Sequence, residues 1–120
     1  EIAAINAAAQ KYTQALNDVV KTPVIPEGYT SSWAQYSVLL DNRQQRDGVQ
    51  KTLKEQGIPT MIYYPRGVHQ QTAYADRCWQ DDLFPNTVEA TNRILSLPMH
   101  PYLGEAEQQL IIDTVLEAVK

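Results

Sequence analysis

A segment near the middle of the chain, residues 57–74, constrains the fold more than any other part of the sequence. It begins at Gly57, a residue typical of the left-handed position just past a helix C-terminus. A short β-branched and aromatic run follows over residues 60–64 and stops at Pro65. The loop beyond Pro65 carries an imidazole, two amides, a guanidinium and a phenol. The pattern predicts a helix end, a strand, and a loop richer in hydrogen-bonding groups than a simple connection requires.

The chain before this segment divides into a helix, a loop and a strand. Apolar residues recur every three or four positions from Ile2 to Val19, which predicts an amphipathic helix. We expect this helix to end before Pro23, because proline cannot continue the hydrogen-bond ladder. Residues 23–32, with two prolines and a glycine, are predicted as a loop. Residues 33–40 are rich in aromatic and β-favouring side chains without helical spacing, so they are predicted as a strand.

Three further elements follow from local signals. A helix that runs to Gln56 has two candidate N-caps, Asn42 and Asp47. The sequence Pro-Asn-Thr at residues 85–87 opens a helix that continues to about Arg93. Residues 95–98 are long enough only for an edge strand or a third strand.

The last predicted helix starts near Gly104, where Glu105 and Glu107 suit its positive end. Its predicted buried face consists of Ala106, Leu110, Ile111, Thr114, Val115 and Ala118. Together these elements predict an α+β domain over residues 1–120, with a small three-stranded sheet packed against helices.

Composition narrows the class of function. The net charge of −4 and the dispersed basic residues argue against nucleic acid as a partner. No apolar stretch reaches the ~20 residues of a membrane-spanning helix, so no membrane partner is expected. A single cysteine, Cys78, excludes an internal disulfide and fits a reducing compartment, so we expect a cytoplasmic protein. We expect that thiol to be part-buried and inert.

No catalytic constellation or metal site can be completed from these residues. The two histidines and one cysteine lack the paired spacings of metal ligands. His69 lies just beyond a predicted strand, where an imidazole could bond a sugar hydroxyl or a phosphate. A solvated or structural histidine is the alternative. Sequence spacing offers no support for a nucleophilic pair of Cys78 with His69.

The order of motifs adds a family resemblance over essentially the whole chain. Residues 57–74 read G-I-P-T-x-x-Y-Y-P-x-x-x-H-x-Q-x-A-Y, and residues 95–101 read L-S-L-P-M-H-P. This order resembles the C-terminal domain of the DegT/DnrJ/EryC1/StrS family of sugar-nucleotide aminotransferases, which depend on pyridoxal phosphate (PLP). One departure lies in the loop, where the family commonly has P-x-P-L-H and this chain has Pro65-Arg66-Gly67-Val68-His69.

The resemblance implies a fold-type I aminotransferase, in which a large N-terminal domain holds PLP on a Schiff-base lysine. The chain begins at Glu1 inside a helical pattern, so we expect that domain to lie upstream in a longer protein. No lysine here suits the Schiff base, since all lie at polar helix positions or chain ends: Lys11, Lys21, Lys51, Lys54 and Lys120. We therefore expect no catalytic or cofactor-binding residue in this chain.

The resemblance also implies a substrate and a site. The expected activity is transfer of an amino group from glutamate to a keto-sugar nucleotide. The expected pathway is surface polysaccharide or glycan synthesis. The expected assembly is a homodimer with active sites at the subunit interface. His69 is the leading substrate-binding candidate, and Tyr64, Gln71 and Tyr74 are weaker ones. The rival hypothesis is a free-standing α+β binding or interaction module without catalysis.

Overall fold

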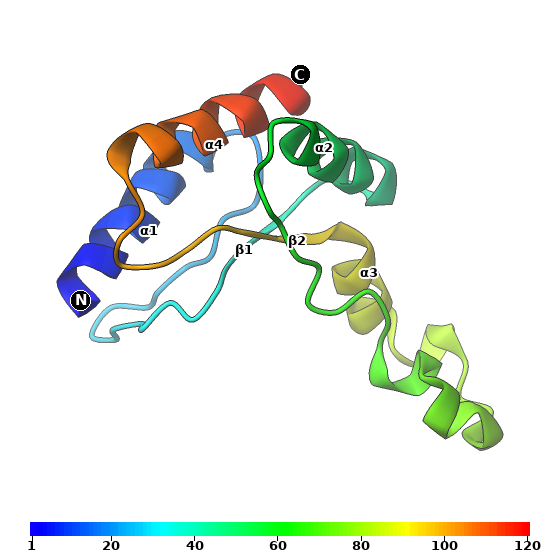
Figure 1. Cartoon of the computed structure of the whole chain (residues 1–120). Coiled ribbons are helices and arrows are strands. Elements are labelled where there is room, and N and C mark those ends of the chain that lie inside the picture. Colours follow the sequence, from blue (N-terminus) through cyan, green and yellow to red (C-terminus); the bar gives the residue numbers. More distant parts are fainter.

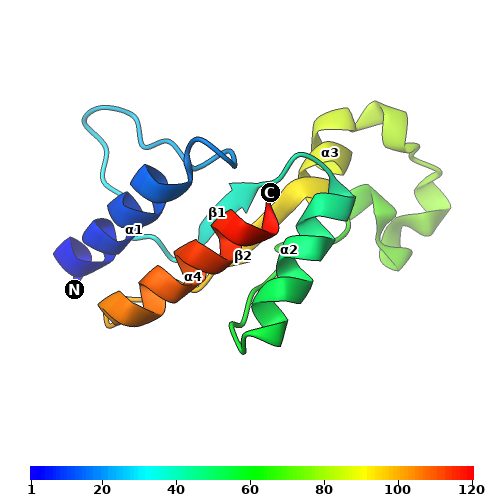
Figure 2. The ribbon, with the colours of Figure 1, turned by 90° about the horizontal axis from the view of Figure 1, so that it is seen from above.

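The computed structural model describes all residues, 1–120, as a helical layer over a small sheet, with a lobe that extends to one side (Figure 1). The α-helices and strands are α1 (Ile2–Leu16), β1 (Tyr36–Leu39), α2 (Arg43–Glu55), α3 (Pro85–Arg93), β2 (Ile94–Leu97) and α4 (Glu105–Ala118). Three short 3₁₀ helices lie between α2 and α3, namely η1 (Val68–Gln70), η2 (Thr72–Arg77) and η3 (Asp81–Leu83). Figure 2 shows α1, α4 and α2 lying in a row above the strands.

The hydrophobic core lies between the helical row and one face of the sheet. In β1, Tyr36 and Val38 are buried while Ser37 and Leu39 are only half-buried, as the two-residue period of a strand requires. The Tyr36 ring lies 5.1 Å from that of Tyr12 in α1. Each fully buried large side chain of this core contributes roughly 1.5–3 kcal/mol to the free energy of folding. The largest are Tyr12, Leu16, Tyr36, Leu40, Leu53, Leu95 and Ile112.

The α+β class is confirmed, but the sheet has two strands rather than three. β1 and β2 are antiparallel, with Tyr36 opposite Leu97 and Leu39 opposite Ile94. The predicted strand over residues 60–64 pairs with β2 only through one bridge, between Met61 and Ser96. This bridge consists of two backbone hydrogen bonds, from the Met61 N–H to the Ser96 carbonyl (3.2 Å) and from the Ser96 N–H to the Met61 carbonyl (2.8 Å).

The predicted helix ends agree well with the structure. The side chain of Asn42 accepts a hydrogen bond from the Gln45 N–H (2.9 Å), so Asn42 rather than Asp47 caps α2. Gly57 has a φ of +75° just past that helix, as predicted. Pro85 occupies the first turn of α3, and the Glu107 carboxylate accepts from the Gly104 N–H (3.1 Å) at the start of α4.

The buried face of α4 is rotated from the predicted one. Its buried residues are Gln108, Ile111, Ile112, Thr114 and Val115, while Ala106 and Leu110 are exposed. This face packs Ile111, Ile112 and Val115 into the core. It also contains a polar contact, in which the Gln108 amide donates to the backbone carbonyl of Ala8 in α1 (2.7 Å), the partner that a buried amide needs.

A buried arginine joins α2 to the base of the lobe. Arg46 is 4% exposed, and its guanidinium donates to Asp47 Oδ1 (2.7 Å) and to the Thr91 carbonyl (2.8 Å). Arg93, at the end of α3, donates to the Leu40 carbonyl (2.6 Å). Because a buried charge without partners is costly, these contacts fix α3 against the body. The lobe is therefore held in place at the end where it joins α3.

Candidate functional site in the projecting lobe

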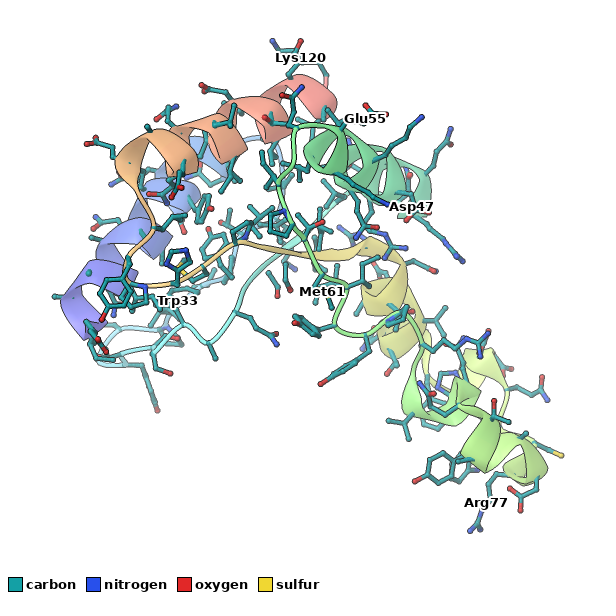
Figure 3. All side chains as sticks on the ribbon, viewed as in Figure 1. Trp33, Asp47, Glu55, Met61, Arg77 and Lys120 are labelled. Carbon is teal, nitrogen blue, oxygen red and sulfur yellow. The ribbon has the colours of Figure 1, made fainter.

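The lobe, residues Pro65–Phe84, is the part of the fold that extends furthest from the helical layer (Figure 1). It contains η1, η2 and η3 and leads directly into α3. Arg77 marks its far end, away from the body, in Figure 3. The structure thus places all four predicted substrate-binding residues, His69, Tyr64, Gln71 and Tyr74, in the lobe or directly before it.

His69 is buried at the centre of the lobe rather than facing solvent from a loop. Its side chain is 4% exposed and lies in η1. The Nε2 atom lies 2.8 Å from Asp81 Oδ1 in η3, and the Gln70 amide donates to the same oxygen (2.9 Å). These two hydrogen bonds, first that of Gln70 and then that of His69, lower the pKa of the Asp81 carboxyl. The pair closes the lobe across twelve residues of chain.

Gly67 allows this closure because no side chain would fit there. A Cβ atom at Gly67 would lie 2.7 Å from Thr87 Cγ2 and 2.8 Å from both Nδ1 and Cε1 of His69. The Gly67 N–H also donates to the Gln70 side-chain oxygen (2.9 Å). A proline at this position, which the P-x-P-L-H pattern would place there, would have no N–H to donate. The glycine at position 67 therefore fits the close approach of Thr87 and His69 and the hydrogen bond to Gln70.

A row of aromatic rings covers the buried imidazole and reaches the lobe surface. Phe84 lies against the His69 ring at 4.7 Å, Trp79 meets Phe84 edge-on at 6.3 Å, and Tyr74 stacks on Trp79 at 6.1 Å. Tyr74 and Trp79 are 40% and 43% exposed. The row therefore joins His69 and Tyr74 into one cluster.

The other two candidates lie outside this cluster. Gln71 is exposed, and its amide makes a long contact with the Arg66 carbonyl (3.4 Å). Tyr64 is 69% exposed and borders a hollow of about 270 Å³ at the base of the lobe, which Arg66 and Thr87 also line. The hollow and the outer face of the cluster present hydroxyl, amide and guanidinium groups that could bind a ligand. Neither contains a nucleophile paired with a base.

Sequence reasoning missed two residues of this site and misjudged a third. Asp81 and Gln70 were not among the predicted site residues, yet Asp81, whose side chain is 61% exposed, bonds the His69 ring, and Gln70 donates to the same Asp81 oxygen. No periodicity connects residues 69 and 81, so only the path of the 3₁₀ turns could reveal the pair. Cys78, expected to be part-buried, is exposed. It lies at a turn with a φ of +54°, outside any packed element.

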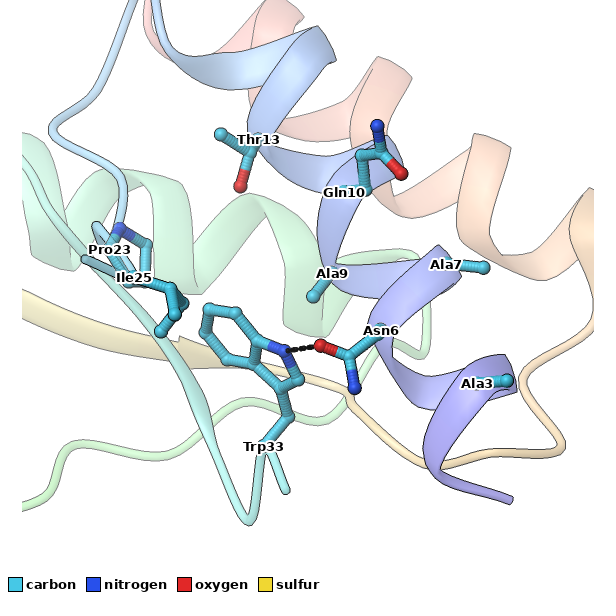
Figure 4. Close-up of a pocket in the computed structure, with 9 residues that line it drawn as sticks. All are labelled: Ala3, Asn6, Ala7, Ala9, Gln10, Thr13, Pro23, Ile25 and Trp33. Atoms are coloured by element: carbon cyan, nitrogen blue, oxygen red, sulfur yellow. Dashed lines mark hydrogen bonds between the residues drawn. The ribbon is translucent and has the colours of Figure 1, made fainter. Parts of the chain in front are cut away.

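A second hollow lies on the opposite part of the molecule, along α1 (Figure 4). It measures about 460 Å³, and its walls carry alanine, proline and isoleucine with no ionisable side chain. Figure 4 shows Trp33 forming one wall, where its indole Nε1–H donates to Asn6 Oδ1 (3.0 Å). The Asn6 amide in turn donates to the Ser31 carbonyl (3.1 Å). This hollow could accommodate a ligand, but it has no side chain that could act as an acid or a base.

The lysines of the chain do not fit a PLP site. A Schiff-base lysine lies in a pocket with its amine desolvated, whereas here four lysines are exposed and Lys11 is half-buried. No group of three or more histidine, cysteine or acidic side chains converges as metal ligands would. No helix is both long and apolar enough to cross a bilayer.

Comparisons with known proteins agree with the motif order. The family model for the DegT/DnrJ/EryC1/StrS aminotransferase family matches residues 2–116. A relative from Pseudomonas aeruginosa, UDP-2-acetamido-2-deoxy-3-oxo-D-glucuronate aminotransferase, is 38% identical over 112 residues, which cover 92% of this chain and 30% of the relative. The chain thus spans about 30% of the length of that relative.

Solved structures share the fold over nearly the whole chain. A DegT DnrJ EryC1 StrS aminotransferase from Brucella abortus has a TM-score of 0.86 and 44% identity, and the match covers 98% of this chain and 31% of that one. DesV of S. venezuelae, solved in complex with a ketimine intermediate, has a TM-score of 0.88 and 27% identity, with coverage of 97% and 31%. The chain belongs to the DegT/DnrJ/EryC1/StrS aminotransferase family.

Proposed function

We propose that the chain is the C-terminal small domain of an enzyme that transfers an amino group from glutamate to a keto-sugar nucleotide. The observation that carries this proposal is the family match over residues 2–116, together with a 38% identical relative named for amination of an oxo-sugar linked to UDP. Surface polysaccharide or glycan synthesis in the cytoplasm is the proposed setting. The remaining, larger part of the enzyme would precede this chain.

The coenzyme of this activity would be PLP, held by the large domain and not by this chain. Structural neighbours that share the fold have been solved in PMP and PLP forms. PLP supplies the electron sink for amino transfer when bound. The exposed lysines of this chain fit no such role, so its own residues contribute binding surface rather than covalent chemistry.

The proposed contribution of this chain is a wall of the substrate cleft built from the lobe. His69 is the main contact, with Tyr64, Gln71 and Tyr74 shaping the same wall. Tyr64 and Tyr74 expose their phenols and Gln71 its amide, groups that suit sugar and phosphate oxygens. His69 makes no hydrogen bond through Nδ1 within the chain, so that nitrogen would be the one to meet substrate.

A homodimer is the proposed assembly. The lobe and its base expose several large apolar side chains, among them Tyr64 (69%), Val68 (66%) and Leu83 (62%). Apolar groups gathered on a projection favour burial in an interface. Sedimentation velocity of the complete protein tests the dimer directly, and a monomer at assay concentration would contradict it.

The activity is tested with the complete protein, PLP and glutamate. The substrates are UDP- and dTDP-linked 3-oxo and 4-dehydro sugars, the classes named for the relatives. We expect one of them to yield α-ketoglutarate and an amino-sugar nucleotide in equal amounts, measured by a coupled dehydrogenase and by mass spectrometry. Sugar-nucleotide binding without amino transfer would instead favour the binding-module hypothesis.

A further inference from the structure

Asp81 touches His69 in a way that determines which ring nitrogen carries the proton. Its Oδ1 lies 2.8 Å from His69 Nε2 and accepts a second hydrogen bond from Gln70 (2.9 Å). The lowered pKa of its carboxyl keeps Asp81 ionised at neutral pH, and an ionised carboxylate can only accept. Nε2 must therefore be the donor, and in the neutral imidazole the lone pair lies on Nδ1.

The surroundings hold the ring in this orientation. Phe84 lies against the imidazole at 4.7 Å, and the side chain of His69 is 4% exposed. Gln70 is anchored at both ends, since its carbonyl oxygen accepts from the Gly67 N–H (2.9 Å) while its amide meets Asp81. A ring flip would break the Nε2 contact and put a carbon atom against the carboxylate. The lone pair on Nδ1 consequently stays on the side next to Gly67.

From this geometry we infer that Asp81 is a positioning residue that fixes His69 as a hydrogen-bond acceptor for a hydroxyl group of the sugar. The inference rests on the proposed function, which supplies the sugar nucleotide. A phosphate oxygen is itself an acceptor, so it has no favourable contact with the Nδ1 lone pair. The specificity of His69 is thus for the sugar and not for the diphosphate.

The proton assignment is tested by NMR on protein labelled with ¹⁵N-histidine. Only two histidines are present, and exposed His100 is the internal reference. We expect an exchange-protected Nε2 proton for His69 at neutral pH. Asp81→Ala should lose this protected proton, while Asp81→Asn, which keeps a carbonyl acceptor, should retain it. Asp82→Ala is the matched control, because Asp82 is exposed and makes no side-chain hydrogen bond. A proton on Nδ1 in the parent protein would overturn the inference.

The functional part is tested in the complete protein by steady-state kinetics. Asp81→Ala should raise KM for the keto-sugar nucleotide by roughly two- to tenfold, the range of one neutral hydrogen bond. The inhibition constant of the free nucleoside diphosphate should not change, since His69 does not meet the phosphates. In a His69→Ala background, Asp81→Ala should raise KM no further, because Asp81 would affect sugar binding only through His69, its bond to Gln70 lying outside the proposed sugar contact.

The outcomes separate the two ideas. If the parent protein aminates no sugar nucleotide, the proposed function fails, and the NMR assignment still decides the His69 proton. If the parent protein is active but Asp81→Ala leaves KM unchanged, the positioning role is wrong. An additional loss in the His69→Ala background would also contradict it, since it would show that Asp81 supports the lobe independently. Weaker inhibition by the nucleoside diphosphate would reassign the contact to the phosphates.

Discussion

Replacing Gly67 with alanine should destabilise the lobe, although alanine suits the backbone there. Gly67 has a φ of −64° and a ψ of 158°, which any residue adopts. Restricting the unfolded chain alone would then stabilise the protein by about 0.4–1 kcal/mol. The new Cβ, however, would lie 2.7 Å from Thr87 Cγ2 and 2.8 Å from the His69 ring. The His69 ring is held by Asp81 and Phe84, so we expect overpacking, at roughly 1–3 kcal/mol, to dominate.

Hydrogen exchange of amides in the lobe measures this local destabilisation directly. The Gln70 and Tyr74 amides donate within the lobe (3.0 and 2.9 Å), and their protection reports lobe opening. A loss of 1–3 kcal/mol corresponds to roughly 5- to 150-fold faster exchange. Gly48→Ala is the matched control, since nothing lies within 4 Å of its Cβ position in α2. That substitution should stabilise the protein by roughly 0.5–1 kcal/mol.

A second variant separates the two clashes. Thr87→Ser removes Cγ2 but keeps the hydroxyl, so it should restore part of the protection lost in Gly67→Ala. The His69 clash would remain, so recovery should be incomplete. Unchanged or slower exchange in Gly67→Ala would contradict this prediction, because it would mean that the imidazole and Thr87 move aside at no cost.

Four further predictions follow from the core and the site. Burial raises the pKa values of Tyr12 and Tyr36 above their ordinary value. The burial of these two neutral phenols stabilises the fold below pH ~10, which is the pKa of tyrosine in the unfolded chain, and this contribution is lost as the pH rises through their pKa values in the folded chain. Phenolate absorbance should show both tyrosines ionising only as the chain unfolds. Arg46→Ala should cost roughly 1–3 kcal/mol in urea unfolding, because it removes the donor of the part-buried Thr91 carbonyl. The exposed control Arg43→Ala should cost about 0.5 kcal/mol or less. His69→Ala in the complete enzyme should lower kcat/KM for the sugar nucleotide by roughly three- to a hundredfold, with the glutamate half-reaction unchanged; equal losses in both would indicate a folding or dimer defect. Incubation of this chain alone with PLP and borohydride should leave no stoichiometric adduct on one lysine by mass spectrometry, and finding one would disprove its binding-surface role.

Helix boundaries that depend on single residues could be predicted from the sequence alone. Asn42, one of the two candidate caps, precedes α2, Pro85 begins α3, and Gly57 follows the end of α2. Each signal acts through the residue's own backbone angles or through a side-chain bond to a nearby amide. Such effects need only neighbours within a few positions of the chain. They are therefore readable without knowledge of the fold, and the order of motifs placed the chain in its family for the same reason.

Contacts between side chains that are distant in sequence could not be predicted in this way. His69 pairs with Asp81 because three irregular turns fold back over twelve residues, a path that no periodic pattern encodes. The buried face of α4 includes Gln108, whose amide reaches a carbonyl of α1. The run over residues 60–64 has strand composition, yet it bridges β2 only at Met61. In each case the outcome depends on a distant partner, and side-chain contacts of that kind are fixed by packing rather than by local propensity.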